Sequence, residues 1–200
     1  MRMCLSELNR IHSHLVWLGT SALELGAISM FWYAFRERDT VLDLFEMATG
    51  VRMHTRYFQV GGLAEDIPEG FYDATRAFAR LMPHAVDDYE GILDKNKIWL
   101  ERTKGIGLLS ADDALALGQS GPMVRASGID WDLRRDEVSP LAWKQCDWKV
   151  WTHSDGDAFA RYWVRLQEVR ESTKIVAQLL VGLPAGPIPA KVPKIVKSPA

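Results

Sequence analysis

The stretch ELNRIHSHLVWLGTSALELG, residues 7–26, decides the fold, because its apolar residues recur at alternating steps of three and four. This spacing places them on one face of an amphipathic helix of about six turns. Gly26 is a suitable end for that helix, since glycine readily adopts the left-handed conformation that closes many helices. The buried face is predicted to consist of Leu8, Ile11, Leu15, Leu18, Ala22 and Leu25.

A second helix is predicted over residues 31–49, FWYAFRERDTVLDLFEMAT, and ends at Gly50. Its charged residues 36–39 indicate a solvated turn of the helix or a break in it. The apolar run 17–35 is about long enough to cross a bilayer, which takes roughly 20 residues. Glu24 lies near the middle of that run, where a carboxylate costs roughly 2.5–3.5 kcal/mol. We therefore expect a buried helix of a water-soluble protein there.

The next stretch, RMHTRYFQVGG at residues 52–62, has a different character. Tyr57, Phe58 and Val60 favour a short strand, because aromatic and β-branched side chains suit a pleated surface. The glycine pair 61–62 allows a tight turn or a close approach of two backbones. A small β element is therefore predicted between helices.

Further helices are predicted from their capping signals. Asp66 is placed to cap a third helix, which Pro83 is expected to kink or divide. Residues 110–113 form a capping box that opens a short helix ending near Gly118. The glycine-rich run 119–135 indicates irregular structure.

The last third of the chain contains a strand-like run and then another helix-capping signal. Tryptophans within residues 143–151 lie in an alternating, strand-like run. Residues 154–157 form a second capping box, opening a long helix that ends at about Leu180. We predict a mainly α (α+β) fold: one helical domain over residues 1–182, a bundle with a small β element, followed by a Pro- and Lys-rich extended tail over 183–200.

Composition excludes several classes of function. The 200 residues carry a formal charge of −2, which gives no general attraction to nucleic acid. Cys4 and Cys146 are far apart and belong to no Cys/His set, so we expect no metal bound by this chain itself. His12 and His14, two residues apart on a helix, point to different faces and do not suit a metal pair.

Two residues remain as candidates for chemistry. Glu24 is a carboxylate in the most apolar part of the chain, and a buried carboxylate is costly unless it is paired. It either titrates abnormally or meets an arginine such as Arg38 or Arg52. His54 is either a satisfied core residue or an imidazole that responds to a charge beside it.

Five ordered motifs between residues 7 and 173 carry a resemblance to a known family. They resemble the D-type core subunit of the proton-pumping NADH–quinone oxidoreductase, respiratory complex I. Its photosynthetic counterpart is the H-type subunit, and both are related to the large subunit of nickel–iron hydrogenases. The motifs are ELNRIHSHLVWLGTSALELGA (7–27), FRERDTVLDLFEMATGVRMH (35–54), VGGLAEDIPEG (60–70), SGPMVRASGIDWDLRR (120–135) and GDAFARYWVRLQEVRES (156–172).

The resemblance implies a role and a set of partners. It implies a hydrogenase-like helical core subunit that binds no cofactor itself and forms one wall of a quinone-reduction cavity. The partners would be a cluster-bearing subunit of the B type and a subunit of the C type, with NADH oxidised elsewhere in the complex. The chain would lie peripherally on the cytoplasmic side of the inner (plasma) membrane.

The resemblance also implies roles for His54, Arg52 and Glu24. In the family, the histidine of the RMH motif lies beside the terminal tetranuclear iron–sulfur cluster of a neighbouring subunit, with Arg52 near that cluster and neither residue a ligand. A negative charge ~5 Å away, at an effective dielectric of ~20, interacts with a unit charge by ~3 kcal/mol. Reduction of the cluster would thus favour proton uptake by His54. Glu24 stands where the family usually has an aspartate that passes charge toward the membrane arm.

The departures from the family leave alternatives open. The segment with a Q-H-P-x-x-H-G-type motif, a quinone-contacting tyrosine and the C-terminal portion have no counterpart here, so we expect a middle fragment, truncated at both ends and inactive in isolation. The rivals are a hydrogenase-type large subunit, which needs cysteine pairs near both ends, and a non-catalytic scaffold.

Overall fold

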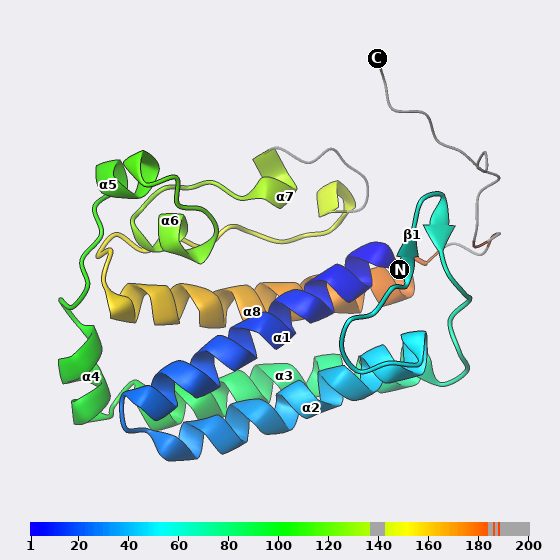
Figure 1. Cartoon of the computed structure of the whole chain (residues 1–200), viewed down its shortest axis with the longest axis horizontal. Helices are drawn as coiled ribbons and strands as arrows, with labels where there is room; N and C mark the ends of the chain where they lie inside the picture. The colour runs from blue at the N-terminus through cyan, green and yellow to red at the C-terminus, as the bar shows by residue number, and fades with distance from the viewer. Residues whose placement is uncertain (137–142, 184–185, 187, 189–200) are drawn as a thin grey trace.

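A computed structural model describes residues 1–136, 143–183, 186 and 188 of the chain. Its four longest helices pack side by side along most of their length (Figure 1), so the predicted mainly α fold with a small β element is confirmed. The four are α1 (Arg2–Glu24), α2 (Ile28–Thr49), α3 (Phe71–Leu93) and α8 (Ala158–Val181).

The first two helices form as the sequence predicts. The apolar stripe of α1 is buried, and its chain leaves the helix at Gly26, where φ is 91°. Gly19 lets the two helices approach closely, because a Cβ atom there would lie 2.9 Å from the Phe35 ring of α2. α2 ends at Gly50 in the left-handed conformation, also as predicted.

Residues 36–39 are neither a break nor a fully solvated turn. α2 continues through them, and the carboxylate of Glu37 is buried. That carboxylate accepts a hydrogen bond of 2.8 Å from the Tyr89 hydroxyl of α3. A polar pair therefore fixes α2 against α3 where the sequence indicated only solvent.

α3 differs from the prediction in its first residue, and it is not divided at Pro83. The helix begins at Phe71 with Gly70 as its N-cap, not at Asp66. The Asp66 carboxylate instead accepts a bond of 2.7 Å from the Ile67 backbone N–H. Pro83 lies inside one continuous helix, so the predicted division is wrong. Burial of apolar side chains on both sides of the proline, including Met82 and Val86, holds the helix together across the missing N–H.

The small β element is confirmed. Strands β1 (Phe58–Gln59) and β2 (Gly62–Leu63) pair antiparallel, with Phe58 opposite Leu63. The tryptophan run 143–151, by contrast, contains no strand. It begins with a short 3₁₀ helix, η1 (Trp143–Gln145), and continues without strand pairing. The Trp151 ring packs against Trp163 of α8, whereas the Trp148 ring lies against the Arg134 guanidinium.

A layer of shorter helices lies along one side of the bundle (Figure 1). It contains α5 (Ala111–Ala116), α6 (Pro122–Ala126) and α7 (Leu133–Asp136), whereas α4 (Lys97–Thr103) lies at one end of the bundle. The run 119–135, predicted to be irregular, therefore contains α6 and most of α7. Pro122 favours α6, because proline suits the first position of a helix.

Of the two predicted capping boxes, the one before α5 is confirmed and the one before α8 is corrected. The Ser110 hydroxyl accepts a bond from the Asp113 N–H and caps α5 as predicted. The cap of α8 is Asp157, not Ser154: its carboxylate accepts a bond of 2.7 Å from the Ala160 N–H. Over the described residues, no helix is both long and apolar enough to cross a membrane. Most of the predicted tail 183–200 lies outside the described residues.

Candidate functional site

The two residues predicted to carry chemistry lie at opposite ends of α2. Glu24 is the last residue of α1, just before α2 begins, and His54 follows the end of α2. A helix of 22 residues is about 33 Å long. Figure 1 shows the α1–α2 turn at one end of the bundle and the β hairpin at the other. Glu24 and His54 therefore belong to two separate places on this chain.

Glu24 is exposed, which corrects the expectation of a buried acid. Neither proposed arginine meets it. Arg52 binds carboxylates at the far end of α2, and the Arg38 guanidinium lies 5.1 Å from the Phe35 ring centroid. The apolar run around Glu24 is divided by the turn at Gly26, so the side chain at the helix end reaches solvent instead of the core.

Arg52 and His54 share a loop that leads from α2 to β1. The Arg52 guanidinium forms ion pairs with Asp39, Asp43 and Glu46, all on α2. His54 is exposed and has a φ of 57°, unlike every other non-glycine residue in the described part of the chain. The left-handed conformation costs a residue with a Cβ atom roughly 1–2 kcal/mol. Such strain is typical of positions that the surrounding structure holds for a purpose.

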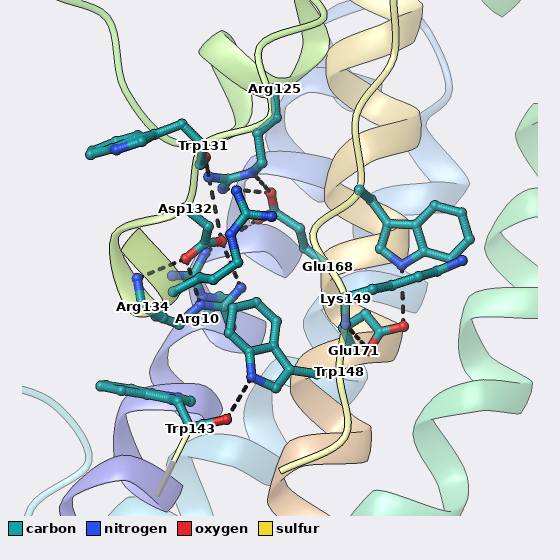
Figure 2. A network of polar contacts seen from close by, with 12 residues as sticks. Arg10, Arg125, Trp131, Asp132, Arg134, Trp143, Trp148, Lys149, Glu168 and Glu171 are labelled. Atoms are coloured by element: carbon teal, nitrogen blue, oxygen red, sulfur yellow. Dashed lines mark hydrogen bonds and ion pairs between the residues drawn. The ribbon is translucent and has the colours of Figure 1, made fainter. Parts of the chain in front are cut away.

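A buried ionic network joins several elements of the protein (Figure 2). At its centre, Arg134 of α7 binds Asp132 through two parallel bonds, of 3.0 and 2.9 Å. Its remaining nitrogen binds both oxygens of Glu7, on α1, at 2.9 and 3.1 Å. Glu7 also accepts a bond of 2.7 Å from the Trp143 indole N–H.

The second half of the network centres on Glu168 of α8. Arg125 donates to one of its oxygens at 2.6 Å, and Arg125 also lies 3.4 Å from Asp132, which joins the two halves. The other oxygen binds His14 at 2.7 Å and Arg10 at 3.3 Å, both on α1. The network thus ties α1, α8 and the α6–α7 segment into one unit.

The pKa values follow from burial and charge. Burial lowers the pKa of His14 below its ordinary value, although the hydrogen bond to Glu168 opposes this. Burial alone would raise the pKa of Glu168, but its bond to His14 and the charges of Arg125 and Arg10 lower it to about 2. The bonds of Asp132 to Arg134 outweigh its burial in the same way and lower its pKa to about 2. At neutral pH the carboxyl groups of Glu168 and Asp132 are therefore charged and His14 is neutral.

Inspection of the sequence missed this network. A signal existed in α1, where Glu7, Arg10 and His14 are spaced as i, i+3 and i+7 and therefore share one helix face. The partners Arg125, Asp132 and Glu168 lie more than 110 residues away, and nothing in their local pattern indicates which helix they meet.

Cavities adjoin both the network and the loop of His54. One of about 400 Å³ is bounded by Glu7, His14 and Arg134, and it shares Trp143 with a neighbouring cavity of about 530 Å³. A third, of about 230 Å³, lies between α1, α2 and the hairpin and is bounded in part by Thr55 and Phe58.

The chemical capacity of the two regions differs. The network pairs three carboxylates, of Glu7, Asp132 and Glu168, with three guanidinium groups, so its charges are matched and it serves packing. The His54 loop presents an imidazole to the outside. Within the described residues, no group of three or more Cys, His, Asp or Glu side chains is placed to hold a metal ion.

Comparison with known proteins adds the family context. Residues 24–200 match the family described as respiratory-chain NADH dehydrogenase, 49 Kd subunit. The chain is 49% identical over 196 residues to a D-type NADH-quinone oxidoreductase subunit of Solibacter usitatus, covering 98% of this chain and 48% of that protein. It is 48% identical over 200 residues to the D-type subunit of Geotalea uraniireducens, covering 100% and 51%. The chain spans about half the length of the curated relatives that it matches.

Proposed function

Because the chain belongs to the family of the 49 kDa subunit of respiratory-chain NADH dehydrogenase, we propose that it works as a core subunit of a proton-translocating NADH–quinone oxidoreductase. It would form one wall of the cavity in which quinone is reduced, next to the terminal iron–sulfur cluster of a partner subunit. The partners would include the cluster-bearing B-type and the C-type subunits, on the cytoplasmic side of the membrane.

The observation that carries the proposal is the placement of His54. Its imidazole is exposed at one end of the bundle on a loop with a strained backbone, where a partner subunit can approach it. The cluster, held by the partner, would supply one electron at a time. The ring nitrogens of His54 would hold the proton that balances the added negative charge, with Arg52 beside it near the cluster.

Glu24 would act at the other end of α2. Its exposed carboxylate, at the end of α1, is free to face a neighbouring subunit and to pass charge toward the membrane arm. The separation of about one helix length from His54 means that the two residues contribute to different steps.

The first test is made on the assembled complex that carries this chain, with His54→Gln. We expect the midpoint potential of the terminal cluster to lose most of its dependence on pH, because glutamine cannot take up a proton. His84→Gln is the matched control, since His84 is also exposed but lies on α3. An unchanged pH dependence in the His54 variant would overturn the proposal for that residue.

The second test separates catalysis from assembly. Glu24→Gln is expected to lower NADH–quinone reductase activity several-fold while the complex still assembles, and Glu69→Gln, another exposed acid, serves as control. Complex that assembles normally and keeps full activity in both the Glu24 and the His54 variants would favour a non-catalytic scaffold.

A further inference from the structure

The loop between α2 and β1 is anchored on both sides of His54. On one side, Gly50 ends α2 in a left-handed turn, after which the chain folds back along the helix. On the other side, Tyr57 is buried, and its carbonyl accepts a bond of 2.9 Å from the Ala64 N–H across the hairpin. Only four residues, 53–56, lie between Arg52 and this second anchor.

Arg52 makes the first anchor through a fork of contacts. One terminal nitrogen donates to Asp43 and, at 3.1 Å, to Glu46, while the other donates to Asp39. The three acids are spaced as i, i+4 and i+7 and form a ridge on one face of α2. A planar guanidinium suits such a fork, whereas a lysine ammonium presents a single point of charge.

His54 lies at the point where the anchored loop turns. Its left-handed backbone is one that a free peptide leaves readily, because the Cβ atom crowds the following carbonyl. No hydrogen bond joins the imidazole to another described side chain, so the ring does not hold itself in place. The contacts that flank His54 on either side are therefore the ones available to hold this conformation.

We propose that Asp39, Asp43 and Glu46 are positioning residues for His54. Through Arg52 they hold the loop in the form that keeps His54 left-handed and its imidazole facing outward. The importance of that orientation for electron transfer rests on the proposed function, whereas the hold on the backbone does not.

The anchor has a measurable strength. The fork is partly exposed, with 38% of the Arg52 side chain and 57% of the Asp43 side chain accessible. Exposed ion pairs change a population by roughly two- to fivefold each, and salt weakens them because the screening length falls to about 3 Å at 1 M. The fork is therefore strong enough to bias one loop and too weak to support the whole bundle.

The direct test measures the backbone of residue 54 by NMR in the full chain, from its amide–Hα coupling and Cα shift. Asp43→Asn, which removes one pair, is expected to lower the ratio of left-handed to extended conformers roughly two- to fivefold. Arg52→Gln, which removes all three pairs, should lower it further, and 1 M salt should lower it in the parent chain. Arg76→Gln is the matched control, because it breaks an exposed pair with Asp73 elsewhere. Asp43→Glu keeps the charge and should restore the parent value. Unchanged couplings in both fork variants would overturn the proposal.

A second measurement uses the assembled complex. Arg52→Gln and Asp43→Asn should flatten the pH dependence of the cluster potential in the direction of His54→Gln but less fully, with Asp43→Glu restoring it. If the NMR couplings change while His54→Gln itself leaves the potential unaffected, the anchor stands and the proposed function fails. If His54→Gln abolishes the pH dependence while the fork variants keep it whole, the positioning role is overturned.

Discussion

Gly156 lies at a position where the backbone of another segment leaves no room for a side chain. A Cβ atom there would lie 2.4 Å from the Leu109 carbonyl oxygen, and φ is 65°. The Leu109 N–H donates to the Gly156 carbonyl at 2.9 Å, so two segments more than 40 residues apart meet backbone to backbone. The sequence predicted only that Gly156 belongs to a capping box. The structure shows that glycine is required there because its backbone contacts the segment before α5.

Replacement of Gly156 by alanine is expected to lower the free energy of unfolding by more than about 2 kcal/mol, because it adds a clash with backbone to the roughly 1–2 kcal/mol of left-handed strain. Gly118→Ala isolates the strain, since Gly118 has a φ of 63° and nothing within 4 Å of an added Cβ. Urea denaturation of both variants measures the difference, and equal losses would show that the Leu109 contact relaxes freely.

Among elements, α8 depends most on a single cap. Asp157 is buried, and its second carboxylate oxygen accepts a bond of 2.8 Å from the Gly105 N–H, just after α4. One side chain therefore starts α8 and also fixes the end of α4 against it. The Ser110 cap of α5 is exposed and holds only its own helix.

Asp157→Ala is expected to cost about 2–4 kcal/mol of unfolding free energy, because it removes a cap of about 1 kcal/mol and also the partly buried bond from the Gly105 N–H to a charged carboxylate. Ser110→Ala should cost about 0.5–1 kcal/mol. Thermal unfolding followed by circular dichroism compares the two. A loss at Asp157 no larger than that at Ser110 would mean that water replaces the bond to Gly105.

At the scale of the whole molecule, the ionic network decides how the outer layer joins the bundle. Arg134 bridges Glu7 and Asp132, and the network then continues through Arg125 to Glu168. Helices α6 and α7 are too short to be stable in isolation. Their position against α1 and α8 therefore depends on matched buried charges as well as on apolar packing.

Arg134→Met should lower the free energy of unfolding by about 3–5 kcal/mol, because it leaves Glu7 and Asp132 buried without their main cation. The adjacent Arg135→Met is the control. Among the described residues Arg135 pairs with Asp130 and Asp136, which are more exposed, so a change of at most about 1 kcal/mol is expected. Chemical denaturation at pH 7 measures both, and similar values would indicate that the network is open to water.

Lowering the pH should reduce the free energy of unfolding through groups of this same network. The folded-state pKa of His14 lies below its ordinary 6.5, so the unfolded chain binds that proton first and stability begins to fall as the pH drops below about 6.5. Glu168, at a pKa of about 2 against an ordinary 4.5, adds a further loss between those two values. His14→Gln should remove the first decline and reduce the second without abolishing it, because Arg125 and Arg10 still lower the pKa of Glu168. A parent chain equally stable at pH 7 and pH 5 would contradict this.

The sequence by itself determined much at the level of elements. The helical spacing in residues 7–26, the stop at Gly50 and the glycine turn after β1 are local signals, and local backbone preference decides them. The family motifs likewise identified His54, Arg52 and Glu24 as candidates by residue type. The start of α3 and the true cap of α8 differ from prediction, and α3 is not divided at Pro83, because tertiary packing overrides local preferences.

Only the tertiary structure decided the surroundings of each candidate. It exposed Glu24, separated it from His54 by the length of α2, and brought Arg52 to three acids on that helix. It also joined Glu7 to Arg134 across 127 positions. Charge pairing and burial depend on which distant segments meet, and that is a property of the packed bundle that no short stretch of sequence contains.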